Sequence, residues 1–199
     1  YWKRFIRDFD TWKKIIVAFI PTGIIGFILY KIIKSILLGD DWIVAGSLFI
    51  VGVILIIVEV YFKKKKKEFG IKDVKDISYK QAAAIGVVQS LGMIPGVSRS
   101  GATILGGLLM GIDRKTIVDF SFLLAVPTML AATGYDLLKS YQDISSSQIG
   151  ILGIGFLVSF LAAIPFIKFL LRFVQKNDFI AFGIYRIFVA ILFTLVLLK

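Results

Sequence analysis

Long apolar runs alternate with short polar segments along almost the whole chain. Five of these runs are long enough to cross a bilayer as α-helices, which takes about 20 residues. Aromatic and basic residues flank them, as is typical where membrane helices reach the lipid headgroups. The expected spans are residues 12–34, 42–62, 116–138, 149–174 and 179–198. The pattern therefore predicts an all-α protein, a polytopic integral membrane helix bundle in which residues 1–199 form a single membrane domain.

Composition supports this assignment and indicates which kind of partner the basic residues have. The chain is 58% hydrophobic with a mean hydropathy of +0.88, which is too apolar for a soluble domain of this size. Its net charge of +11 comes from basic residues at the edges of the apolar runs. There they mark cytoplasmic loops, as the five lysines at 63–67 do, so the membrane is the expected partner and nucleic acid is not. The sequence has no cysteine or histidine and so offers neither a disulfide nor histidine proton transfer.

A sixth apolar segment, residues 81–112, has a different pattern. Basic residues lie at both of its ends, Lys80 before it and Arg114 after it, so we expect both ends to be cytoplasmic. In its middle, Pro95 and Gly96 should break the helix, because proline lacks a backbone donor and glycine permits unusual dihedral angles. The segment is therefore predicted to be a re-entrant helical hairpin over residues 81–112. Non-helical backbone at that depth is tolerated only where it is buried in protein or lines a wet cavity, which favours a site at the break.

The residues just after the break have the chemistry of an anion site. The first N–H groups of the second helix, an arginine and several hydroxyls together suit a phosphate. The predicted catalytic residues are Ser98 and Arg99, and the predicted substrate-binding residues are Gln89, Gly96, Ser100, Gly101 and Thr103. A structural alternative is a capped turn with Ser100 as the N-cap, and Gln89 equally suits a hydrogen bond to a neighbouring helix. A serine nucleophile stays open, because no base is in view to activate it.

Three further charged residues fall within the expected spans: Glu59, Asp119 and Arg186. Charges at membrane depth need partners, and all three should lie toward the cytoplasmic half. The favoured interpretation is a structural ion pair or triad among them.

Several motifs resemble those of one family. The stretch Q-S-L-G-M-I-P-G-V-S-R-S-G-A-T-I begins at Gln89 and is followed by G-G-L-L-M-G, F-S-F-L-L-A-V-P and, near the end, F-G-I-Y-R-I-F-V-A. Together they look like the bacterial undecaprenyl pyrophosphate phosphatases, the BacA-type enzymes linked to bacitracin resistance. P-G-x-S-R-S-G is a specific motif in this context, and the resemblance covers the whole chain.

The resemblance implies a function and an architecture. Members of the family hydrolyse the terminal phosphate of a polyprenyl pyrophosphate lipid, undecaprenyl pyrophosphate, and so recycle the carrier for peptidoglycan synthesis in the bacterial plasma membrane. They are built from two inverted repeats, each with a re-entrant hairpin, and the serine and arginine of the motif bind and polarise the pyrophosphate. A divalent cation, Mg or Ca, is implied as cofactor.

The sequence also departs from the family pattern. The E-x-x-x-E pair and the histidine of the family's first repeat are absent, so no metal ligand is assigned here and the chain is expected to be a fragment, inactive by itself. The alternative function is a transporter or flippase of a phosphorylated polyprenyl lipid, since broken membrane helices also hold anionic substrates in transporters. Whether the protein forms a homodimer stays open.

Overall fold

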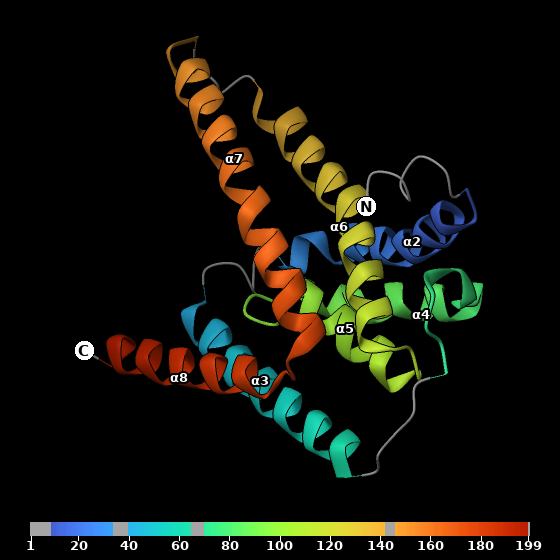
Figure 1. Ribbon diagram of the computed structural model, residues 1–199. Coiled ribbons are helices and arrows are strands. Elements are labelled where there is room, and N and C mark those ends of the chain that lie inside the picture. The colour runs from blue at the N-terminus through green and yellow to red at the C-terminus, as the bar shows by residue number, and fades with distance from the viewer. Residues whose placement is uncertain (1–8, 34–39, 65–69, 142–145, 199) are drawn as a thin grey trace.

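The computed structural model describes residues 9–33, 40–64, 70–141 and 146–198, and in these segments the chain is almost entirely helical (Figure 1). The long helices are α2 (Phe9–Ile32), α3 (Asp41–Lys64), α6 (Arg114–Ser140), α7 (Ser146–Lys176) and α8 (Ile180–Leu197). Between α3 and α6 lie two short helices, α4 (Tyr79–Ser90) and α5 (Arg99–Leu109), and the single 3-10 turns η2 (Val74–Asp76) and η3 (Leu91–Met93).

The predicted spans are confirmed. Five helices are long and apolar enough to cross a membrane: Phe9–Tyr30, Asp41–Lys64, Arg114–Lys139, Ile149–Val174 and Ile180–Leu197. Each lies within a few residues of its expected range, because the apolar run and its charged flanks limit a membrane helix more tightly than propensity limits a soluble one. The protein is therefore an all-α, multi-pass membrane protein.

The segment predicted to be a re-entrant hairpin contains α4 and α5, which pack against each other. Its two ends lie together, since the side-chain amide of Gln81 donates to the carbonyl of Met110 over 3.4 Å. Just before the segment, Ile71 forms a parallel bridge with Ile112 and its carbonyl accepts from the amide of Asp113 over 2.8 Å. Ser78 caps α4 through a capping box with Gln81, which fixes where the first helix begins. The bounds 81–112 and the depth of the segment in a bilayer stay predictions.

Two groups of helices hold this segment. In the first, α2 and α6 pack on α4 and α5 around a core of fully buried side chains: Ile15, Ala18, Ala82, Ile85, Leu108, Ile117, Phe120 and Leu124. Helices α2 and α4 come very close, because a Cβ added at Gly86 would lie 1.9 Å from a backbone oxygen of α2.

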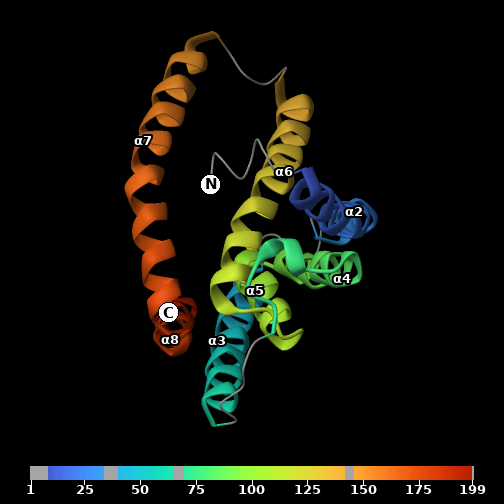
Figure 2. The ribbon, with the colours of Figure 1, turned by 45° about the vertical axis from the view of Figure 1, so that its right-hand side comes forward.

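The second group is the pair α3 and α8. They are in close backbone contact, since a Cβ added at Gly183 would lie 2.7 Å from the carbonyl oxygen of Gly52. Helices α6 and α7 run away from the other helices toward one end of the molecule (Figures 1 and 2). The apolar side chains of α7 are exposed along most of its length, as befits a helix that faces lipid.

Candidate active site at the helix break

The break between α4 and α5 has an irregular backbone that other helices hold in place. After η3 the chain turns at Gly96, with φ 86°, and again at Ser98, with φ 76°. Ser98 is the one residue other than glycine with a positive φ in the described segments, and such a conformation is strained for a side chain of this kind. The break lies where Pro95 and Gly96 predicted it.

Ser98 starts the second helix. Its hydroxyl oxygen accepts a hydrogen bond from the amide of Gly101 over 3.2 Å and lies 3.3 Å from the hydroxyl oxygen of Ser100. The N-cap is therefore Ser98, and the alternative that placed it at Ser100 is wrong. The difference arises because α5 begins at Arg99, two residues before the apolar run that starts at Gly101 and that indicated the helix start in the sequence.

The first turn of α5 provides donors for an anion. The backbone amides of Arg99 and Ser100 have no acceptor within the described residues, as expected for the first N–H groups of a helix. The helix dipole adds partial positive charge at the same place. Hydroxyls at positions 98 and 100 lie beside these amides, and Gly101 adds no side chain there.

The side chain of Arg99 reaches across to α6. Its Nη1 donates to the Thr128 hydroxyl over 2.5 Å and makes a long contact of 3.5 Å with the Ala125 carbonyl. Thr128 itself donates to a carbonyl one turn back, either Leu124 over 2.8 Å or Ala125 over 3.0 Å. Because a guanidinium has five N–H donors and only Nη1 is engaged with described residues, Arg99 can be held by Thr128 and still bind an anion. Sequence reasoning missed Thr128, whose position directly after Pro127 inside a membrane helix was its one signal.

The structure places Gln89 and Thr103 in a buried network between helices. The Gln89 amide donates to the hydroxyl of Thr22 on α2 over 3.2 Å, and Thr22 lies 2.7 Å from the Gly86 carbonyl. The hydroxyl of Thr103 lies 3.3 Å from the Gln89 side-chain oxygen and 2.9 Å from the carbonyl of Arg99. Gln89 and Thr103 are 1% and 0% exposed. Their hydrogen bonds connect α2, α4 and α5 and hold the first turn of α5 in place. Their assignment as substrate ligands stays a prediction.

The charge at the break is positive. Arg186 of α8 donates through Nη2 to the carbonyl oxygens of Gly96 and Val97, the second over 3.1 Å. Neither Arg99 nor Arg186 forms an ion pair with any residue in the described segments. Two guanidinium groups beside one helix N-terminus, with no carboxylate to neutralise them, suit a multiply charged anion.

A divalent cation does not fit this set of side chains. Over residues 9–33, 40–64, 70–141 and 146–198, no three carboxylates gather into a group that could hold a metal ion. Hydroxyls, amides and guanidinium groups bind phosphate oxygens, whereas proteins usually hold Mg²⁺ through one or two carboxylates, and Ca²⁺ through several carboxylate or carbonyl oxygens. The described residues at the break therefore suit an anion and not a metal ion.

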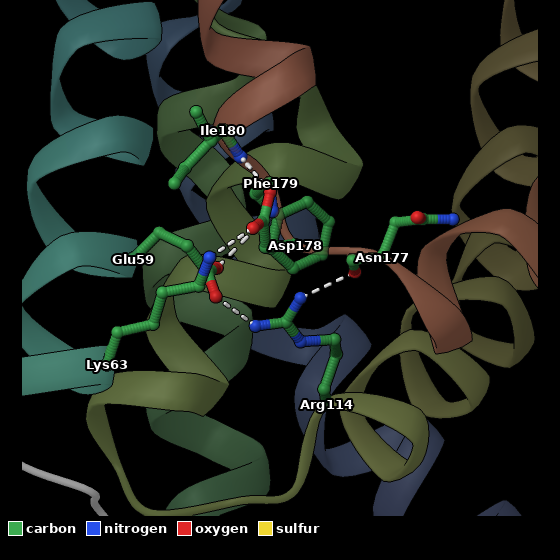
Figure 3. A network of polar contacts seen from close by, with 7 residues as sticks. All are labelled: Glu59, Lys63, Arg114, Asn177, Asp178, Phe179 and Ile180. Atoms are coloured by element: carbon green, nitrogen blue, oxygen red, sulfur yellow. Dashed lines mark hydrogen bonds and ion pairs between the residues drawn. The ribbon is translucent and has the colours of Figure 1, made fainter.

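The predicted ion pair or triad of Glu59, Asp119 and Arg186 is wrong for Glu59 and Arg186, which do not pair with each other. Glu59 of α3 pairs with Arg114 at the start of α6 and also accepts a hydrogen bond from the amide of Phe179 over 3.3 Å (Figure 3). Arg186 lies at the helix break instead, as described above. The pattern of charges showed that partners were needed, but the pairing depends on how α3, α6 and α8 are rotated about their axes.

The ion pair of Glu59 has a structural role at the predicted cytoplasmic ends of the helices. Arg114 also donates to the carbonyl of Asn177, and Lys63 pairs with Asp178 beside it (Figure 3). The Lys63 ammonium lowers the pKa of Asp178 through a direct hydrogen bond. This cluster joins α3, α6 and the turn between α7 and α8.

These features define a class: a multi-pass membrane protein with a candidate anion site at the broken segment between two helices. Comparison with known proteins agrees. The family model described as bacitracin resistance protein BacA matches residues 3–192. The chain therefore belongs to the BacA family.

Curated relatives are similar over nearly the whole chain. The undecaprenyl-diphosphatase of Aquifex aeolicus (strain VF5) is 49% identical over 193 residues, which cover 97% of this chain and 74% of that protein. The undecaprenyl-diphosphatase of Sulfurihydrogenibium sp. (strain YO3AOP1) is 50% identical over 195 residues, covering 98% and 75%. One from Campylobacter jejuni subsp. jejuni (strain 81-176) is 46% identical over 194 residues, covering 97% and 71%.

Proposed function

We propose that this protein hydrolyses undecaprenyl pyrophosphate to undecaprenyl phosphate and inorganic phosphate. The observation that carries the proposal is the Ser98–Arg99 start of α5, with free amides, hydroxyls and an arginine that has no acidic partner among the described residues. The names of the relatives, all undecaprenyl-diphosphatases, support the same substrate. The protein would act in a bacterial plasma membrane and recycle the lipid carrier of cell-wall synthesis, which is how such an enzyme confers bacitracin resistance.

The reaction breaks the bond between the terminal phosphorus and the bridging oxygen, while a water oxygen bonds to that phosphorus. Phosphoryl transfer needs positioning and stabilisation of negative charge more than covalent chemistry. Arg99, held by Thr128, would bind the phosphate oxygens through its remaining N–H groups. The amides of Arg99 and Ser100 and the hydroxyls of Ser98 and Ser100 would bind the same group from the helix end. With the two phosphates fixed at this end of α5, the lipid tail can remain in the bilayer.

The alternative of a transporter or flippase for a phosphorylated polyprenyl lipid has the same anion site but no bond cleavage. The relatives carry the name of a hydrolase, and this favours hydrolysis. The two functions differ in one observable, the release of inorganic phosphate.

The test is phosphate release from C55 or C15 pyrophosphate by the full-length protein purified in detergent. Arg99→Ala should lower kcat/KM at least about 100-fold, because a donor at the reacting phosphate is lost. Arg172→Ala is the matched control, since Arg172 is an exposed arginine on α7 away from the break, and should retain activity. Undiminished release by Arg99→Ala would refute the site, and absence of release by the natural protein would refute the function.

A further inference from the structure

Three consecutive carbonyl groups at the break are held by side chains from outside the segment. The carbonyl of Pro95 accepts a hydrogen bond from the Ser47 hydroxyl of α3, which also lies 3.1 Å from the carbonyl oxygen of Val44 on its own helix. The next two carbonyls, of Gly96 and Val97, accept from Arg186 of α8. All three backbone oxygens are therefore drawn toward the pair formed by α3 and α8.

The direction of a carbonyl fixes the direction of the amide in the same peptide unit. Because the peptide group is planar and trans, the N–H points opposite to the C=O. Holding the carbonyls of Pro95 and Val97 thus turns the amides of Gly96 and Ser98 away from α3 and α8. Neither amide has an acceptor in the segments that the structure describes. They extend the row of free donors that begins the second helix.

The two side chains act from one packed unit. Gly52 and Gly183 bring the backbones of α3 and α8 into contact, so Ser47 and Arg186 keep a fixed distance from each other. Gly96 fits closely against this unit, since a Cβ there would lie 2.1 Å from the Ser47 hydroxyl oxygen. The break is therefore held against a rigid surface.

The environment of Arg186 argues against a purely stabilising role. Its Nε atom is buried and has no acceptor among the described residues, and its partners are neutral carbonyls. Burying a guanidinium inside a membrane helix with such partners is costly, and an apolar side chain would pack there at lower cost. Arg186 gives order to a strained backbone at the expense of stability.

We propose that Ser47 and Arg186 are positioning residues that aim the amides of Gly96 and Ser98 at the phosphate group of the substrate. They need not touch the substrate themselves. The proposal rests on the phosphatase function given above and adds two backbone donors, with the side chains that orient them, to the site.

The test measures the inhibition constant, Ki, of inorganic phosphate in the phosphate-release assay, using a fluorescent or labelled C15 pyrophosphate to separate product from inhibitor. Ki does not depend on the fraction of folded enzyme, so a variant that only destabilises the protein leaves it unchanged. Arg186→Met and Ser47→Ala should each raise Ki by about tenfold, the effect of one lost hydrogen bond to a charged group. Arg186→Lys retains a cationic donor and should raise Ki less than Arg186→Met does.

Matched controls, with Arg99→Ala as the reference variant, distinguish failure of the positioning proposal from failure of the proposed function. Arg172→Met and Ser159→Ala replace exposed residues of α7 and should leave Ki unchanged. Ser47→Ala involves no charge, so an increase there supports orientation by hydrogen bonds over a field effect of Arg186. If Ki rises for Arg99→Ala but stays unchanged for both Ser47→Ala and Arg186→Met, the positioning proposal is refuted while the function stands. If the natural protein releases no phosphate, the proposed function itself is refuted.

Discussion

Ser98 combines two opposed demands, and replacing it by glycine or by alanine should separate them. Its φ of 76° is strained for a residue with a Cβ, and its hydroxyl caps α5 through the amide of Gly101. Glycine removes both the strain and the hydroxyl. Alanine removes the hydroxyl and keeps the strain. The pair therefore isolates the backbone conformation from the chemistry of the side chain.

The magnitudes favour the glycine variant. Relief of a positive φ is worth about 1–3 kcal/mol. Against this, Ser→Gly at an N-cap costs only a few tenths of a kcal/mol and the greater freedom of the unfolded chain costs roughly 0.5–1 kcal/mol. Ser98→Gly should thus be as stable as the natural protein or more stable. Ser98→Ala should lose about 1 kcal/mol, the usual cost of a lost cap.

Activity should fall in both variants, whatever their stability. If the hydroxyl binds the phosphate as proposed, both variants should release phosphate at least about 100-fold more slowly. Thermal unfolding in detergent, followed by tryptophan fluorescence, reads stability, and roughly 2–4 °C in Tm corresponds to 1 kcal/mol for a chain of this size. Equal Tm values for the two variants would refute the strain, and full activity of Ser98→Gly would refute a role for the hydroxyl.

Three further predictions concern the framework. Arg114→Met should lower the free energy of unfolding by about 3–5 kcal/mol, because it leaves the buried carboxylate of Glu59 without its cation. The measurement is the Tm, which should be lower for Arg114→Met than for the control variant Arg172→Met. Gly86→Ala should lower the free energy of unfolding by a net of about 1–2 kcal/mol, since overpacking against the backbone of α2 outweighs roughly 1 kcal/mol of helix propensity; an unchanged Tm would contradict the close contact. Lys63 lowers the pKa of Asp178 in the folded protein. The pair therefore stabilises the protein at pH values above the unfolded pKa of about 3.9, and this contribution is lost as the pH falls through the pKa of the folded state. Asp178→Asn should remove that part of the pH dependence of Tm, and a pH profile identical to the natural protein would refute it.

Much of the fold could be predicted from the sequence because the bilayer restricts it. An apolar run of about 20 residues has few alternatives to a membrane helix, and this is why all five spans were found. The break at Pro95 and Gly96 was equally predictable, since proline and glycine act on the backbone where they stand. Its neighbours Ser98 and Arg99 were recognised by residue type and by their place at a helix start.

Side-chain partners could not be predicted in the same way. Arg186 was assigned to an ion pair or triad with Glu59 and Asp119, and the structure places it on the carbonyls of Gly96 and Val97, 90 and 89 positions earlier in the chain. Ser47 gave no signal at all, as a serine in an apolar helix commonly bonds to its own backbone. Such pairings depend on helix rotation and on close contacts between glycines, and a run of apolar residues on every side of a helix contains no information about either.

The shortness of α4 and α5, whose outer ends lie together, has a consequence for how the protein is made. These helices have 12 and 11 residues, or about 18 and 16 Å, and so each is far shorter than the roughly 30 Å of hydrocarbon that a spanning helix must cross. Neither can therefore leave the translocation machinery as a stable membrane segment by itself. The pair has to wait for α2 and α6, whose buried faces complete its core, and would then enter the bilayer as a unit. Assembly of the proposed phosphate site is thus a late event, and it becomes possible only after the ribosome has completed α6.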